Sequence, residues 1–168
     1  MNLYVACSLT NVPAENFNEY TQFIQKLHIQ LESNGFNIEN ALSNSSPFDS
    51  TLDSLVNAKN CYNWHKELIT QSDVVIAEVS FPSLGVGIEL QLANQLGIPT
   101  YLIYNPCIAS TATSKSFKND KQIHSTTNIT HDYISSMALG MDCVKNVLSY
   151  TEYEAIGNEI TSLLNMHV

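Results

Sequence analysis

The chain has 168 residues, of which 44% are hydrophobic, and its formal net charge is −9 at pH 7. This size and apolar content suffice for one hydrophobic core, so we expect a single domain over residues 1–168. The negative charge argues against nucleic acids and anionic membranes as partners, because each would repel the chain. No apolar run reaches the roughly 18 residues of a membrane helix, and Met1 leads directly into a strand pattern without a basic leader. We therefore expect a cytoplasmic protein.

The cysteines are widely spaced and form no CxxC pair. In a protein without secretory features this spacing favours reduced thiols in the core over disulfides. The residues concerned are Cys7, Cys61, Cys107 and Cys143.

In the N-terminal half, short apolar runs alternate with longer segments of helical period. A helix is predicted over 15–33 from the spacing of its apolar residues, and Gly35 follows its end, as is common at helix termini. The Ser- and Asn-rich segment 40–53 predicts a mobile loop that can lie over a site. The predicted elements of this half are strands 3–7, 36–39 and 74–79 and helices 15–33 and 55–71.

The C-terminal half continues the alternation but contains one segment without a period. Residues 105–130 are polar and rich in Ser, Thr and Asn, which predicts an irregular insertion or a lid. The other predicted elements are strands 98–104 and 143–148 and helices 134–139 and 152–164. Strands that alternate with helices predict an α/β fold: a doubly wound parallel sheet of the Rossmann or flavodoxin type between two helical layers.

The segment around residue 80 contains the strongest pattern in the chain. Residues 74–79, VVIAEV, read as a buried parallel strand, and a turn that contains Pro82, Gly85 and Gly87 follows its carboxyl end. Glu89 is then predicted in the first turn of the next helix, where the positive end of the helix favours a charged carboxylate. Open α/β sheets bind ligands in the crevice beyond the carboxyl ends of their strands. The sequence therefore predicts a functional site here.

The sequence AEVSFPSLGVGIEL, residues 77–90, resembles the signature of the nucleoside 2-deoxyribosyltransferase family. The resemblance is closest to its 2′-deoxynucleoside 5′-monophosphate N-hydrolase branch. It is dense over 72–90, weaker over 3–8, and present again over 134–140. It implies a homodimer with a shared active site that acts on a small deoxynucleotide or deoxynucleoside, and it implies neither a metal nor an organic cofactor.

The resemblance implies that Glu89 is the nucleophile that attacks C1′ of the deoxyribose. Cleavage of a glycosidic bond needs such a carboxylate and a proton for the departing base, because the transition state is oxocarbenium-like. By position alone, Glu89 would more often be an acid that only complements the helix dipole.

The proton donor is where the chain departs from the family. The family has an aspartate 24 positions before the nucleophile, and this chain has His65 there. An imidazolium can protonate a purine near neutral pH, so His65 can serve as the acid. The alternative is a surface or packing histidine in a protein whose catalysis is slowed or lost. Tyr4 matches a family tyrosine beside the nucleophile; otherwise it is an ordinary aromatic residue of a strand.

Three serines match family positions that receive the 5′-phosphate: Ser8, Ser83 and, from the neighbouring subunit, Ser135. Hydroxyl and backbone N–H groups donate to phosphate. The nucleoside-transferring branch of the family instead has an aspartate near the position of Ser83, and its carboxylate would repel a phosphate. Each serine alone is weak evidence, because serine is common in turns. Thr10 stands where the nucleotide branch has an arginine, which disfavours phosphate binding unless Lys59 or Lys115 compensates.

Two acidic residues flank the central strand. Asp73 is predicted to cap the entrance of the strand, and Glu78 to orient Tyr4 or a sugar hydroxyl from behind the site. The histidines lack metal-ligand spacing, and Gly85 and Gly87 form only half of a dinucleotide fingerprint.

The sequence thus predicts hydrolysis of 2′-deoxynucleoside 5′-monophosphates to free base and deoxyribose 5-phosphate. One alternative is base exchange by a nucleoside 2-deoxyribosyltransferase. The other is a nucleotide-binding module that has lost its acid.

Overall fold

The structure is a computed structural model that describes residues 1–42, 49–109, 115–118, 124–127, 130–131 and 134–166. The helices are α1 (Ala14–Ser33), α2 (Ser54–Thr70), α3 (Leu84–Leu96), α4 (Ser136–Leu139) and α5 (Tyr153–Asn165). The strands are β1 (Asn2–Ala6), β2 (Asn37–Asn40), β3 (Val74–Glu78), β4 (Thr100–Tyr104), β5 (Lys115–Lys118), β6 (His124–Thr127), β7 (Thr130–His131), β8 (Ile134–Ser135) and β9 (Val144–Ser149).

Five of these strands form one parallel sheet in the order β2-β1-β3-β4-β9. Leu3 pairs with Val74 and Ala6 pairs with Ala77, so the carboxyl ends of β1 and β3 lie at the same end of the sheet. The strand order reverses between β1 and β3, which is the switch point where such sheets bind ligands. The predicted doubly wound parallel sheet is confirmed.

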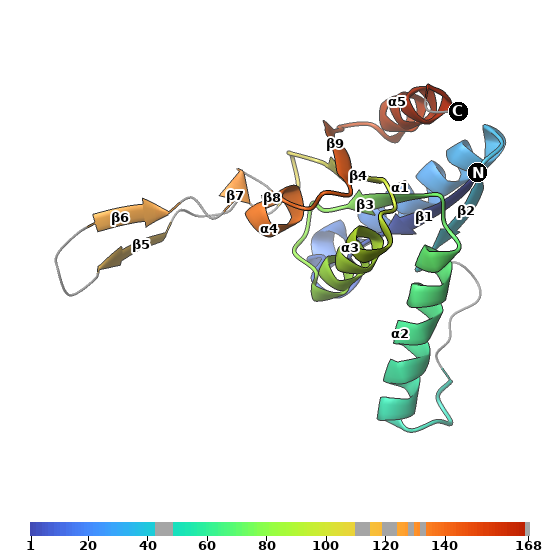
Figure 1. Cartoon of the computed structure of the whole chain (residues 1–168), viewed down its shortest axis with the longest axis horizontal. Coiled ribbons are helices and arrows are strands. Elements are labelled where there is room, and N and C mark those ends of the chain that lie inside the picture. The colour runs from blue at the N-terminus through green and yellow to red at the C-terminus, as the bar shows by residue number, and fades with distance from the viewer. Residues whose placement is uncertain (43–48, 110–114, 119–123, 128–129, 132–133, 167–168) are drawn as a thin grey trace.

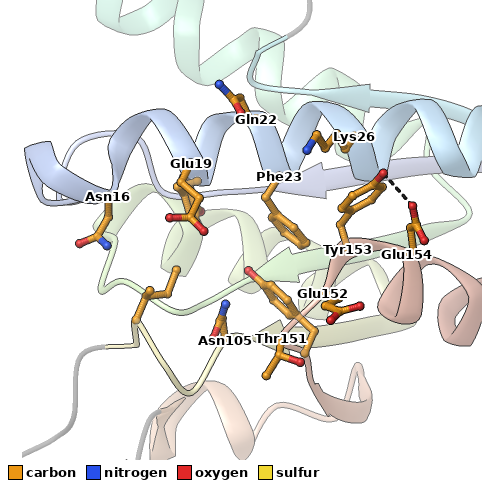
Figure 2. Close-up of a pocket in the computed structure, with 13 residues that line it drawn as sticks. Asn16, Glu19, Gln22, Phe23, Lys26, Asn105, Thr151, Glu152, Tyr153 and Glu154 are labelled. Carbon is orange, nitrogen blue, oxygen red and sulfur yellow. Dashed lines mark hydrogen bonds between the residues drawn. The ribbon is translucent and has the colours of Figure 1, made fainter.

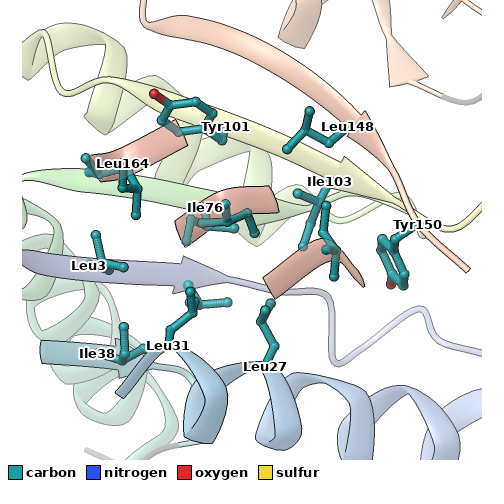
Figure 3. Packing of buried hydrophobic residues seen from close by; sticks show 14 residues of the cluster. Leu3, Leu27, Leu31, Ile38, Ile76, Tyr101, Ile103, Leu148, Tyr150 and Leu164 are labelled. Atoms are coloured by element: carbon teal, nitrogen blue, oxygen red, sulfur yellow. The ribbon is translucent and has the colours of Figure 1, made fainter. Parts of the chain in front are cut away.

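Helices cover both faces of the sheet (Figure 1). On one face, α1 and α5 pack side by side over a core that includes Leu27, Ile76 and Ile160 (Figure 3). On the other face, Tyr4 and Val75 pack with Val86 and Leu90 of α3. Because successive strand residues point to opposite faces, Tyr4 belongs to the second core and its neighbours Leu3 and Val5 belong to the first.

Helix α3 begins at Leu84, within the segment that the sequence pattern predicted to be a turn. Ser83 is its N-cap and accepts a hydrogen bond from the N–H of Val86. The helix ends at Gly97, whose φ of 69° is a left-handed conformation that favours glycine. Glu89 therefore lies in the second turn rather than the first. Gly85 and Gly87 are helical residues rather than turn residues, so the expected turn is shorter.

The segment between β4 and β9 is more regular than its polar composition predicted. Strands β5 and β6 form an antiparallel pair, and in Figure 1 this pair extends away from the parallel sheet. The helix predicted over 134–139 is divided: β8 pairs with β7, and only α4 is helical. Part of the predicted loop, residues 43–48, lies outside the described residues.

The buried residues of helix α2 are Asn57 and Ile69, so most of the helix is accessible to solvent. Figure 1 shows it projecting beyond the sheet. Among the described residues, no helix is both long and apolar enough to cross a bilayer. Cys7 and Cys143 are buried free thiols as expected, but Cys61 and Cys107 are exposed, so the prediction of core positions was wrong for these two.

Candidate active site

Three side chains meet on the face of the sheet that α3 covers. Tyr4 Oη donates a hydrogen bond to Glu89 Oε1 over 2.8 Å and lies 2.6 Å from His65 Nδ1. The distance from His65 Nδ1 to Glu89 Oε1 is 3.0 Å. The sheet, α2 and α3 each contribute one residue, so the site joins positions that lie far apart in the sequence.

The three side chains of this cluster are largely shielded from solvent. Tyr4 is fully buried, and the side chains of His65 and Glu89 are 18% and 11% exposed. Burial first, and then the neighbouring Glu89 carboxylate, raise the pKa of Tyr4 far above its ordinary value of 10. The hydroxyl thus keeps its proton over the physiological range and remains a hydrogen-bond donor to Glu89.

The hydrogen bonds also assign a proton on His65. The single hydroxyl proton of Tyr4 is used in the bond to Glu89 Oε1. The short contact between Tyr4 Oη and His65 Nδ1 then requires Nδ1 to be the donor. This arrangement directs Nδ1 to Glu89 and Tyr4, and leaves Nε2 as the ring nitrogen that can face a ligand.

The second oxygen of the Glu89 carboxylate differs from the first. Oε2 is buried, and no residue in the described part of the chain donates a hydrogen bond to it. A buried carboxylate oxygen without a donor is costly in a folded protein. A ligand could supply the missing donor, but Oε2 has essentially no exposed surface in this structure, so the groups that cover it would first have to move.

The glycines before Glu89 leave space along α3. A Cβ atom added to Gly87 would meet no heavy atom within 4 Å, and one added to Gly85 would meet only the Ser83 hydroxyl at 3.6 Å. Neither residue has a positive φ, so left-handed conformation does not account for glycine here. Gly85 lies one turn before Glu89 on the same side of the helix, so it leaves an open surface beside the carboxylate, whereas Gly87, two residues before Glu89, points to the other side.

The three serines lie in different segments of the chain. Ser8 follows β1 and is fully buried, and its Oγ has no hydrogen-bond partner among the described residues. Ser83 caps α3, and the nearby Asn11 side chain donates to the carbonyl of Pro82, which ties the loops after β1 and β3 together. Ser135 is exposed and caps α4.

Glu78 does not orient Tyr4, contrary to the prediction. Its side chain lies on the other face of the sheet, where it accepts hydrogen bonds from the Ser80 side chain and, over 3.0 Å, from Tyr150 Oη. Burial raises the pKa of Glu78, and bonds from Ser80, Tyr20 and Tyr150 oppose that rise. The alternation of side chains along β3 placed it there, since Val74, Ile76 and Glu78 share a face.

Asp73 lies at the amino end of the sheet, opposite the cluster. Its carboxylate accepts a hydrogen bond from the backbone N–H of Asn2 over 2.7 Å, and its own N–H donates to the Asn2 carbonyl. It therefore joins β1 to β3 as the predicted cap at the strand entrance and is too remote to support the site. Within the described residues, no group of three His, Cys, Asp or Glu side chains could hold a metal ion.

Sequence reasoning missed one neighbour of the cluster. The Trp64 ring packs edge-to-face against the His65 ring, with centroids 4.8 Å apart and an interplanar angle of 75°. Adjacent residues on a helix point in different directions, so the spacing gives no signal for this contact. The contact restricts the orientation of the His65 ring.

Solved structures resemble this fold at low sequence identity. The CMP N-glycosidase BcmB of Clostridium botulinum matches with a TM-score of 0.59 and 16% identity over 95% of this chain and 98% of its own. A 2-deoxyribosyltransferase from Bacillus psychrosaccharolyticus matches with a TM-score of 0.60 and 16% identity, over 94% of this chain and 91% of its own. The chain has the 2-deoxyribosyltransferase fold.

A conserved protein from Enterococcus faecalis V583 shares this fold too, with a TM-score of 0.60 and 17% identity over 96% and 98% of the two chains. No protein-family model and no curated protein sequence matches this chain. The fold that the resemblance implied is therefore confirmed by structure, and the activity remains a matter for the residues of the site.

Proposed function

We propose that the protein hydrolyses the N-glycosidic bond of a 2′-deoxynucleoside 5′-monophosphate through a glycosyl-enzyme intermediate on Glu89. The observation that carries this proposal is the buried Glu89 carboxylate, with Oε1 held by Tyr4 and Oε2 without a described donor. In this mechanism Oε2 attacks C1′ and the bond from C1′ to the base nitrogen breaks. Water then attacks C1′, which releases deoxyribose 5-phosphate and regenerates the carboxylate.

His65 supplies the proton that the departing base needs. Its Nδ1 donates within the cluster, so Nε2–H of the imidazolium is the donor to a nitrogen of the base. His65 is not a simple surface histidine, because its side chain is only 18% exposed and contacts both other residues of the cluster. Tyr4 holds Glu89 in place through Oε1 and leaves Oε2 for the attack.

The 5′-phosphate is assigned to the loops after β1 and β3. The buried and unpartnered hydroxyl of Ser8 can donate to a phosphate oxygen, and the N-terminus of α3 beside Ser83 presents backbone N–H groups. The CMP N-glycosidase of the same fold is named for a nucleoside monophosphate, which agrees with this choice.

A panel of deoxynucleoside 5′-monophosphates, assayed for free base, tests the proposal. Glu89→Gln keeps an acceptor for the Tyr4 hydroxyl but removes the nucleophile, so we expect activity to fall by about 10³-fold or more. Glu67→Gln, an exposed substitution on α2, is the control for the loss of one carboxylate. Full activity of the Glu89 variant would disprove the assignment.

The second candidate is a nucleoside 2-deoxyribosyltransferase. All seven basic residues of the chain are lysines, and Thr10 is exposed where the nucleotide branch has arginine. A missing charge-assisted hydrogen bond would weaken phosphate binding by about 1.5–3 kcal/mol. Lys59 is exposed on α2, and the side chain of Lys115 lies outside the described residues. Transfer of deoxyribose to a labelled acceptor base would favour this candidate over hydrolysis.

The third candidate is a binding module without activity, which the replacement of the family aspartate by His65 would explain. Thermal stabilisation by deoxynucleotides together with no release of free base would identify such a module.

We also propose that the protein is a homodimer whose subunits contact each other through α3 and α4. Leu84 and Ile88, one turn apart on α3, are 81% and 44% exposed, so an apolar surface lies at the N-terminus of this helix. Met137 of α4 is also 81% exposed, and it lies two residues after Ser135, the serine that the family resemblance assigns to the other subunit. Sedimentation should show a dimer, and Leu84→Glu should shift it toward the monomer. A monomeric native protein would refute the proposal.

A further inference from the structure

One cavity lies on the face of the sheet opposite to Glu89. It has a volume of about 350 Å³ and is bounded by the first half of α1, the loop after β4 and the connection from β9 to α5 (Figure 2). This volume is in the range of small-molecule sites. It opens at the carboxyl ends of β4 and β9, where parallel sheets bind ligands. The function proposed above does not use it.

Aromatic rings form one wall of this cavity. Phe23 and Tyr150 stack in parallel, with centroids 4.3 Å apart and an interplanar angle of 4°. Tyr153 also lines the cavity, and the ammonium group of Lys26 lies 4.9 Å from the centre of its ring. That distance is within the range of a cation–π interaction. The wall therefore already accepts one cation, which the chain itself supplies.

Carboxylates surround the same cavity. Glu19 of α1, and Glu152 and Glu154 before and within α5, oppose the single ammonium of Lys26, so the formal charge of the lining is −2. Figure 2 shows Glu19 and Phe23 projecting from α1 toward the segment that contains Thr151 and Glu152. An anionic ligand would be repelled here, whereas a cation gains from both the carboxylates and the rings.

Hydrogen bonds hold the Tyr150 side of the cavity in place. The Tyr150 hydroxyl donates to the buried Glu78 carboxylate, and Ser80, which donates to the same carboxylate, accepts the backbone N–H of Asn105. These bonds fix Tyr150 and the loop after β4 relative to β3. A flat ligand would thus meet a preorganised surface and lose little free energy in ordering the protein.

We propose that this cavity binds a small organic cation with a flat apolar body, such as a protonated arylalkylamine. The ring of the ligand lies against the wall formed by Phe23 and Tyr150, and its ammonium group faces Glu19 and Glu152. Binding here is separate from the chemistry at Glu89, because the two places are on opposite faces of the sheet.

Three probes that share a phenyl ring on a short chain test the proposal: phenethylamine, 2-phenylethanol and 3-phenylpropionate. In a titration followed by backbone amide NMR, we expect phenethylamine to give saturable shifts in residues 150–154 and at Asn105. The neutral alcohol should bind about tenfold more weakly, and the carboxylate should not bind. Equal binding of all three probes, no saturable binding of the amine, or shifts confined to the α3 face would overturn the proposal.

Variants separate the role of charge from that of folding. We expect Glu19→Gln and Glu152→Gln each to weaken phenethylamine binding by about threefold, and the double variant by about tenfold, as partly screened ion pairs do. Glu15→Gln lies on the same helix but does not line the cavity, so it should leave the affinity unchanged. Affinity that falls equally in the Glu15 variant would contradict a local site. Glu89→Gln should bind the amine normally.

Discussion

In the proposed mechanism, the contact between His65 and Tyr4 decides which nitrogen of the ring can act as the proton donor. The ring donates through Nδ1 to the hydroxyl that holds Glu89, so any proton for a leaving group must come from Nε2. Trp64 packs against the ring and limits its rotation. An aspartate side chain is shorter, and both of its oxygens are on one carbon. It could not contact Tyr4 and donate to a base from opposite sides, as the two nitrogens of an imidazole ring can.

We therefore predict that His65→Asn affects substrates according to their leaving groups. Asparagine can still donate to Tyr4 but cannot protonate a base. Turnover of a deoxynucleoside monophosphate should fall by about 100-fold, the lower range for a lost general acid. Turnover of 4-nitrophenyl 2-deoxyribose 5-phosphate, whose leaving group needs no proton, should change little. An equal loss on both substrates would mean that His65 only positions Glu89.

Helix α3 is the element that decides the geometry of the site. Its start at Leu84 places two glycines in the first turn and Glu89 in the second. Glycine is unfavourable within a helix by roughly 0.5–1 kcal/mol relative to alanine. Gly85, which lies on the side of Glu89, has no steric reason of its own for this cost, because among the described residues an added Cβ would meet only the Ser83 hydroxyl, at an ordinary contact distance of 3.6 Å. A ligand that lies against the helix would provide the reason.

The variant Gly85→Ala tests this explanation. We expect the free energy of unfolding to rise by about 0.5–1 kcal/mol, because alanine is the better helix former. At the same time kcat/KM should fall about tenfold or more if a sugar lies against this surface. Gly97→Ala is the contrasting control, since its left-handed φ predicts lower stability without a direct effect on the site. Higher stability with unchanged activity would remove Gly85 from the site.

At the scale of the whole molecule, several buried hydroxyl and thiol groups link stability to pH. Burial, as the largest cause, raises the pKa of Tyr4, Tyr20 and Tyr150 far above the ordinary value of 10. It also raises the pKa of Cys7 from 9.0 to about 12. In each case the folded state keeps a proton that the unfolded state releases in alkaline solution.

The sign follows from this difference in bound protons. These groups contribute fully to stability below pH 9, and their contribution is lost as the pH rises through 10 and beyond. Each group should lower the free energy of unfolding by about 1.4 kcal/mol per pH unit there. Urea unfolding between pH 8 and 11 measures the slope. Tyr150→Phe should reduce this slope by the contribution of one group, about 1.4 kcal/mol per pH unit. Tyr62→Phe, at an exposed tyrosine, should leave the slope unchanged. Equal slopes for all three proteins would contradict the prediction.

The sequence by itself determined the sheet, most helices and the identity of the central carboxylate. Strands such as 74–79 are short apolar runs, and the helices carry a clear period, so local pattern and burial agree there. The start of α3 was misplaced, because Leu84, Gly85 and Gly87 are poor local evidence for a helix that Ser83 caps and the sheet supports. In the segment after β4, pairing between β5 and β6 decided the structure, and polar composition gave no sign of it.

Only the tertiary structure decided which side chains meet. Register and alternation placed Glu78 on the opposite face from Tyr4, although both belong to neighbouring strands. The meeting of Tyr4, His65 and Glu89, and the acidic aromatic cavity, join residues from separate elements. Hydrophobic periodicity reports which face of an element is buried, but it does not report which residues of another element lie against that face. That information comes from packing.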